Sequence, residues 1–163
     1  MTDVAVVDTN VWLDLFVFLD PRSALLMQAL GSATGPVAVR CAQTDAEIES
    51  VLRRPRFAAR CSEHDERLRR WRALARPCDL KGAAPWSCRD RDDQKFLDLA
   101  CAARATLLLT KDKALLSLNR RTRREGLLIL SAVDFGRNLH HDGASERQRV
   151  VQRVVPPQAQ FLR

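Results

Sequence analysis

Four acidic side chains, far apart in the sequence, stand where they could meet and do chemistry. Asp8 directly follows the apolar run from Val4 to Val7, and Asp112 follows the apolar run from Thr106 to Leu109 by way of Thr110. A short apolar run without alternation is typical of a buried strand in a parallel sheet. Because function gathers at the carboxyl ends of such strands, we expect both acids at one edge of a sheet.

A third acid, Asp93, stands at the start of an expected helix. It precedes Phe96 by three residues and Ala100 by seven, so its carboxylate lies in line with the buried stripe of that helix. Such a carboxylate sits at the mouth of the core rather than in free solvent. Its neighbours Asp90 and Asp92 more often cap a helix or compensate its dipole.

The fourth acid is a glutamate, and spacing alone leaves open whether it is Glu47 or Glu49. The two side chains lie on opposite sides of Ile48 at about 100° per residue. Thr44 with Glu47 three residues later has the pattern of a capping box, which gives Glu47 a purely structural alternative.

Crowded carboxylates need cations, because they otherwise repel one another and raise each other's pKa. Oxygen ligands are those that Mg²⁺ and Mn²⁺ prefer. Two such ions would neutralise four acids, activate a bound water, and stabilise the attacking and leaving oxygens of a phosphodiester from positions about 4 Å apart. The acids therefore predict metal-dependent phosphodiester cleavage.

Strands and helices alternate along the chain. Strands are expected at Val4 to Val7, Val37 to Val39, Thr106 to Leu109 and Leu127 to Leu130. Helices are expected from Trp12 to Leu19, Pro21 to Leu30, Thr44 to just before Pro55, about 63 to 75, Asp92 to about Arg104, and Ala114 to Leu116. The stretch 76 to 89 should be mainly loop, with at most a short strand. This order predicts a three-layer α/β sandwich with a mainly parallel sheet of four to five strands, flanked by helices.

Length and composition favour one folded domain. A chain of 163 residues suits one domain, which we place at residues 1–138, followed by a polar tail at 139–163. No apolar run approaches the roughly 20 residues that span a bilayer, and the first residues lack the basic region of a secretory signal. Five cysteines without a CxxC pair are expected as reduced thiols in a cytoplasmic protein.

The chain carries a net charge of +7, which favours polyanionic partners, although an arginine-rich composition alone would produce it. Arg53 and Arg54 follow the glutamate helix and could contact RNA phosphates. Trp71 could stack on an unpaired base, but burial or a dimer contact is the more common role for such a tryptophan.

Four strings in this order resemble those of PIN-domain ribonucleases: VVDTNVW, EIESVLRRPRF, DRDDQKFLDLA and LLLTKDKALL. The resemblance covers roughly residues 4 to 135 and is closest to the toxin components of toxin–antitoxin systems related to VapC. It implies an endoribonuclease that uses Mg²⁺ or Mn²⁺, a cognate antitoxin protein and a homodimer. The residues implied to be catalytic and metal-binding are Asp8, Glu47, Asp93 and Asp112.

Other residues take supporting roles in this interpretation. Thr9, Asn10, Thr110 and Asp92 are expected to orient the acids through hydrogen bonds. Lys111 departs from the small residue common in relatives, so it could bind a phosphate or weaken metal affinity.

Two alternatives stay open. An aspartate-dependent phosphatase of the haloacid-dehalogenase type would need a second aspartate where Asn10 stands. A non-catalytic RNA- or protein-binding module on a PIN-like scaffold would not need four intact acids.

Overall fold

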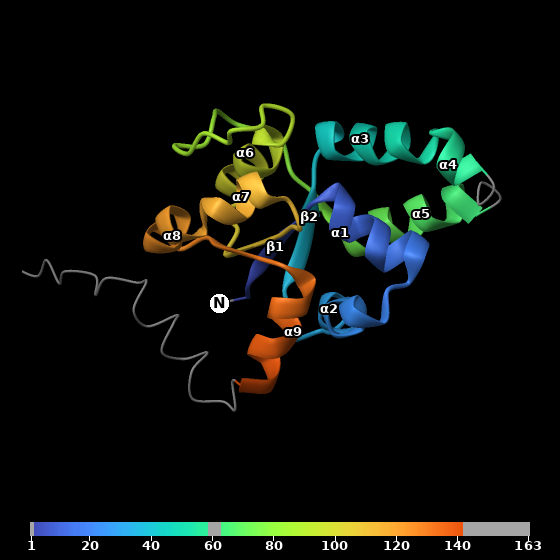
Figure 1. Ribbon diagram of the computed structural model, residues 1–163, viewed down its shortest axis with the longest axis horizontal. Coiled ribbons are helices and arrows are strands. Elements are labelled where there is room, and N and C mark those ends of the chain that lie inside the picture. Colours follow the sequence, from blue (N-terminus) through green and yellow to red (C-terminus); the bar gives the residue numbers. More distant parts are fainter. Residues whose placement is uncertain (1, 59–62, 142–163) are drawn as a thin grey trace, which may run out of the picture.

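A five-stranded sheet forms the centre of the computed structural model, which describes residues 2–58 and 63–141 (Figure 1). The strands are β1 (Val4–Val7), β2 (Val37–Arg40), β3 (Arg76–Pro77), β4 (Leu107–Leu109) and β5 (Leu128–Leu130). Their order is β3-β2-β1-β4-β5, and every neighbouring pair is parallel. The predicted parallel α/β architecture is confirmed, including the short strand at the start of the 76 to 89 stretch.

Helices cover both faces of the sheet (Figure 1). They are α1 (Thr9–Leu13), the π-helix η1 (Asp14–Phe18), the 3₁₀ helix η2 (Pro21–Ser23), α2 (Ala24–Leu30), α3 (Ala42–Leu52), α4 (Pro55–Ala58), α5 (His64–Leu74), α6 (Gln94–Ala102), α7 (Lys113–Ser117), α8 (Asn119–Thr122), the 3₁₀ helix η4 (Arg123–Glu125) and α9 (Ala132–His141). No helix among the described residues is long and apolar enough to cross a membrane.

Successive residues of a strand belong alternately to two hydrophobic clusters, one on each face of the sheet. Ala5 and Val7 of β1 join the cluster that α1, η1, α2, α3, α5 and α9 cover. Val6, between them, joins the cluster on the other face, where Phe96 of α6 and Leu115 of α7 are fully buried. Burial on both faces explains why the strands read as unbroken apolar runs rather than as alternating patterns.

An aromatic group anchors the first of these clusters. The Trp12 and Phe16 rings stack with centroids 5.2 Å apart, and Trp71 of α5 meets Phe16 edge-on at 5.9 Å. Trp71 is only 1% exposed, which agrees with the more common role of a buried tryptophan and leaves the ring unable to stack on an RNA base. Its ring serves to pack α5 onto the sheet.

Helix α3 begins earlier than expected. Cys41 caps it, and the Thr44 hydroxyl accepts a hydrogen bond from the Cys41 backbone N–H at 3.0 Å. The prediction that Thr44 caps this helix with Glu47 closing a capping box is therefore wrong. The same hydroxyl performs a capping function from inside the first turn, which leaves the Glu47 side chain available for other contacts.

Helix α9 was not expected from the sequence. Ser131 and Asp134 close its first turn, because the Asp134 N–H donates to the Ser131 hydroxyl at 3.1 Å and that hydroxyl donates to the Asp134 carboxylate at 2.7 Å. Phe135 is buried in the first cluster. The helix runs past residue 138, where the polar tail was expected to begin, and residues 142–163 of that tail lie outside the described residues.

Candidate active site

Two of the acids stand at the turns that lead from neighbouring strands into helices. Asp8 follows β1 and caps α1, and its backbone N–H donates to the Leu109 carbonyl of β4 at 2.9 Å. Asp112 follows β4 and caps α7, accepting hydrogen bonds from the Ala114 and Leu115 N–H groups at 2.7 and 3.1 Å. Both acids therefore lie at the carboxyl edge of the sheet, as predicted from the strand ends.

Thr110 connects these two acids. Its hydroxyl donates to Asp8 Oδ2 at 2.6 Å and accepts from the Asp112 backbone N–H at 2.9 Å. The side chain is fully buried, so water does not compete for either bond. This geometry is what an orienting role for Thr110 requires.

The other expected orienting residues lie differently. The Thr9 hydroxyl is buried and has no hydrogen-bond partner among the described residues. Asn10 contributes its backbone N–H, which donates to Asp8 Oδ1 at 3.3 Å. Asp92 is exposed and its N–H donates to Asp90 at 2.9 Å, which places it at the turn before α6 rather than on the acids.

The two remaining acids approach from helices on either side. Asp93 is the residue that caps α6, and its carboxyl group is influenced by the charges of Asp8 and Asp112. Glu47 of α3 is the glutamate whose charge acts on Asp8. Glu49 instead pairs with Arg72 at 2.6 Å, on the side of α3 that faces α5. Of the two glutamates, Glu47 is therefore the one whose charge acts on Asp8, whereas Glu49 pairs with arginines.

Burial and neighbouring charges make the carboxyl groups of Asp8 and Asp93 hard to ionise. Burial raises the pKa of Asp8, and the charges of Glu47 and Asp112 raise it further, while hydrogen bonds from Thr110 and Asn10 oppose the rise. Burial, with the charges of Asp8 and Asp112, raises the pKa of Asp93 to about 6. A positive charge placed among these groups would lower the pKa values of both Asp8 and Asp93.

A lysine provides part of that charge. Lys95 Nζ lies 2.5 Å from Glu47 Oε2, and it also donates to the Asp92 backbone carbonyl. Both partners of the ion pair are mostly buried, with 20% and 28% of their side chains exposed. Lys95 therefore neutralises one of the four acids from within the chain, a contact that the sequence analysis did not anticipate.

A second lysine is turned toward a buried acid outside the cluster. Lys111 Nζ contacts both carboxylate oxygens of Asp14, at 2.7 and 2.9 Å, and Asp14 is only 6% exposed. A phosphate contact, as considered for Lys111, would compete with this ion pair. The pair joins the end of β4 to the π-helix η1.

The donor set fits a hard divalent cation in its chemistry. Asp8, Asp93, Asp112 and Glu47 offer only carboxylate oxygens, and burial together with the charges of Asp8 and Asp112 raises the pKa of Asp93. As the described side chains stand, however, no three acids, histidines or cysteines are gathered in a way that could hold a metal ion. Lys95 already occupies one oxygen of Glu47 in this arrangement.

The arginines expected to contact RNA lie on the surface after α3. Arg53 has 80% of its side chain exposed and lies 3.6 Å from Glu49, and Arg54 is also exposed. An exposed ion pair of this kind is weak, so both guanidinium groups remain accessible to a polyanion.

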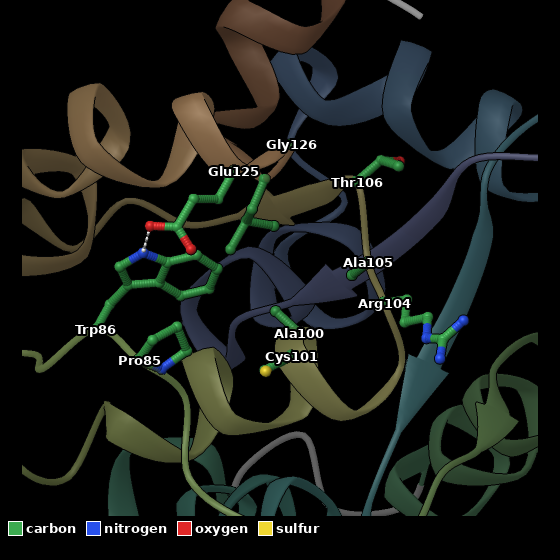
Figure 2. Close-up of a pocket in the computed structure, with 10 residues that line it drawn as sticks. Pro85, Trp86, Ala100, Cys101, Arg104, Ala105, Thr106, Glu125 and Gly126 are labelled. Atoms are coloured by element: carbon green, nitrogen blue, oxygen red, sulfur yellow. Dashed lines mark hydrogen bonds between the residues drawn. The ribbon is translucent and has the colours of Figure 1, made fainter. Parts of the chain in front are cut away.

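A cavity of about 370 Å³ lies at the opposite edge of the sheet (Figure 2). Thr106 and Leu127, which line it, immediately precede β4 and β5, so it opens at the amino ends of the strands. Its most prominent polar contact is internal, because the Trp86 ring N–H donates to Glu125 at 3.2 Å. The cavity has no part in the acidic cluster.

This fold and this arrangement of acids agree with the comparison to known families. The PIN domain family matches residues 4–114, a range that contains all four acids. The chain therefore belongs to the PIN-domain family. PIN domains are generally nucleases that use divalent metals. No curated protein matches the chain.

Proposed function

We propose that this protein is an endoribonuclease that hydrolyses RNA phosphodiester bonds with Mg²⁺ or Mn²⁺. The observation that carries the proposal is the position of Asp8 and Asp112 at one edge of a PIN-domain sheet, with Asp93 close enough that burial, together with the charges of these two acids, raises its pKa to about 6. Carboxylates placed close together cost stability unless a bound ligand offsets their repulsion. A divalent cation, bound together with a phosphodiester substrate, would offset it.

Asp8, Glu47, Asp93 and Asp112 are the residues that would hold the ion. Bound Mg²⁺ or Mn²⁺ supplies a charge that stabilises the phosphorane-like transition state and lowers the pKa of a coordinated water. Binding at all four acids would require Glu47 to exchange its Lys95 partner for the ion.

The remaining groups position the acids and the substrate. Thr110 fixes Asp8 and Asp112 relative to each other through its two hydrogen bonds. The buried Asp8 carboxylate also accepts from the Asn10 N–H, so its two oxygens keep fixed directions. Arg53 and Arg54, with the overall charge of +7, favour approach of the RNA backbone toward an edge that would otherwise repel it.

We further propose that the enzyme acts in the cytoplasm as the toxin of a toxin–antitoxin pair, bound by a cognate antitoxin protein and assembled as a homodimer. This rests on the resemblance of the four sequence strings to VapC-related toxins. The intact set of four acids favours catalysis over a binding-only module. The asparagine at position 10, where a phosphatase would need an aspartate, disfavours the phosphatase alternative.

The test is cleavage of total RNA by the purified full-length protein, with sequencing of the new ends. We expect cleavage that stops with EDTA and returns with Mg²⁺ or Mn²⁺. Cleavage that persists unchanged in EDTA would overturn the metal mechanism. Absence of any RNA cleavage under all these conditions, with a folded protein, would overturn the ribonuclease assignment.

A further inference from the structure

The cavity at the amino edge of the sheet has the size and the lining of a small-molecule site. Its volume of about 370 Å³ lies at the lower end of the range of about 300–1,000 Å³ that ligand pockets occupy. One side is formed by Pro85 and the ring of Trp86, whose ring N–H is held by Glu125 at 3.2 Å (Figure 2). An apolar or aromatic ligand would find a fixed aromatic wall here.

Arg104, which also lines the cavity, has a backbone conformation that is typical of glycine. It follows helix α6 with φ of 51°, in the left-handed region. The Ala105 N–H donates to the Ala100 carbonyl at 2.8 Å, and the Arg104 N–H donates to the Cys101 carbonyl at 3.1 Å. These two bonds make a Schellman motif, in which glycine is the usual residue at the position of Arg104.

A second residue of the lining has a positive φ, and there the chain does use glycine. Gly126 follows η4 with φ of 92°. The arginine at position 104 therefore carries a backbone cost that glycine would avoid, and strained residues of this kind cluster at functional sites. The fold gives the side chain no evident use, because the Arg104 guanidinium has no ion pair or hydrogen bond among residues 2–58 and 63–141.

The charges around the cavity favour an anion. Figure 2 shows Arg104 across the cavity from Trp86, with its guanidinium directed outward. Arg123 and Arg124 of η4, which immediately precede Glu125, are exposed, and neither forms an ion pair within the described part of the chain. Three guanidinium groups thus accompany one carboxylate, and the net positive charge attracts an anionic ligand.

We propose that this cavity binds a small organic anion, with an apolar or aromatic body against Trp86 and Pro85 and a carboxylate or phosphate group at Arg104. A guanidinium without a partner can bind either group through two parallel hydrogen bonds. A ligand that extends outward from the aromatic wall would bring its charged end to Arg104. The proposal is independent of the ribonuclease function, since none of the four acids lines the cavity.

The test follows the thiol of Cys101, which is exposed and lines the cavity, so that a bound ligand would shield it. The full-length protein is alkylated with N-ethylmaleimide, and peptide mass spectrometry gives the rate at each cysteine with and without a probe. The probes are phenylacetate, phenyl phosphate and the neutral phenylacetamide. Cys78, which is half-buried and does not line the cavity, is the control within each sample.

At a probe concentration of about 10 mM, we expect at least one of the two anions to slow alkylation of Cys101 about threefold, as for a Kd of about 5 mM. Alkylation of Cys78 should not change, and phenylacetamide should slow that of Cys101 less than about 1.5-fold. Protection by phenylacetate alone would assign the site to carboxylates, and protection by phenyl phosphate alone would assign it to phosphates.

Two variants separate the contact at Arg104 from general charge. Arg104→Gly should abolish the protection of Cys101, while its melting temperature equals or exceeds that of wild type, because glycine adopts the left-handed conformation without strain. Arg124→Ala removes an exposed arginine that does not line the cavity, and it should change the protection less than about twofold.

Four results would overturn the proposal. Cys101 protected by neither anion would show that the cavity takes no such ligand, and equal protection by phenylacetamide would show that charge has no part in binding. Unchanged protection in Arg104→Gly would place the anion elsewhere. An equal loss in Arg124→Ala and Arg104→Gly would show attraction to a basic surface rather than a built site.

Discussion

The two edges of the sheet differ in how their polar groups are balanced. At the amino edge, Trp86 and Glu125 beside the 370 Å³ cavity are paired with each other, and Thr106 donates to Asp3 at 2.9 Å. At the carboxyl edge, the buried Asp8 and the half-buried Asp93 lie near other acids, and the pKa of each is raised. Acidic groups that lie close together, rather than the existence of a cavity, therefore set the carboxyl edge apart from the amino edge.

The contrast follows from how a parallel sheet is built. Every strand of this sheet ends at the same edge, so the acids that begin α1 and α7 are placed side by side by the topology alone. Helix capping gives Asp8 and Asp112 a local structural role, but it does not require Glu47 and Asp93 to approach them. Glu47 nevertheless lies where its charge acts on Asp8, and Asp93 lies where the charges of Asp8 and Asp112 act on it.

The largest effect is expected from removing a charge at the carboxyl edge. Asp8→Asn should lower RNA cleavage by about 10²- to 10³-fold, because it removes an electrostatic group at the reaction centre. The melting temperature should not fall, since burial already disfavours the ionised form of Asp8. Glu66→Gln, which changes an exposed acid on α5, is the matched control. Cleavage within tenfold of wild type in Asp8→Asn would contradict the account.

The next effect concerns the dependence of stability on pH. The pKa of Asp93 is raised from 3.8 to about 6 in the folded protein, so the folded state binds a proton more tightly than the unfolded chain does. The stabilisation from this group is full below the unfolded pKa and is lost as the pH rises through the window from about 4 to 6.

Urea unfolding of the metal-free protein at several pH values measures this loss. Asp93→Asn should not show this loss of stability, and its free energy of unfolding should exceed that of wild type at pH 7 without divalent ions. Near pH 4 the difference between the two proteins should become smaller or change sign. A difference between the two proteins that stays constant across this range would show that the pKa of Asp93 is not raised in the folded protein.

A smaller effect is expected at the ion pair that partly balances this edge. Lys95→Met should lower the free energy of unfolding of the metal-free protein by about 1 kcal/mol, because Glu47 then faces Asp8 without its counter-charge. Adding Glu47→Gln should restore most of the loss. A double-mutant cycle in which the two changes simply add would show that the pair is not coupled.

The smallest effect is expected at the amino edge. Glu125→Gln keeps an acceptor for the Trp86 ring N–H, so cleavage should change less than about twofold and stability by less than about 0.5 kcal/mol. A tenfold loss of cleavage would make the amino-edge cavity part of the active site and would remove the contrast between the edges.

Sequence alone could predict the frame of this site because the frame depends on local patterns. The apolar runs before Asp8 and Asp112 identify strands that are buried on both faces, and their ends define an edge. The stripe behind Asp93 likewise follows from helical spacing. Helix α9 carried a signal that could have been used, since Ser131 and Asp134 have the spacing of a capping box.

The charge balance of the site could not be predicted in this way. Glu47 and Lys95 belong to α3 and α6, which are separated by α4, α5, β3 and a long loop, and Lys111 and Asp14 are 97 residues apart. Nothing in the local sequence of either partner indicates such a pair. Trp71 shows the same limit, because its position on an arginine-rich helix does not reveal that the ring points into the core.

The most direct test of the central claim is an anomalous diffraction measurement on crystals of the full-length protein soaked in Mn²⁺. We expect an anomalous peak among the carboxylates of Asp8, Asp93 and Asp112 at the carboxyl edge, and loss of that peak in Asp8→Asn crystals. A manganese peak at any other place, with none at this edge, would contradict it.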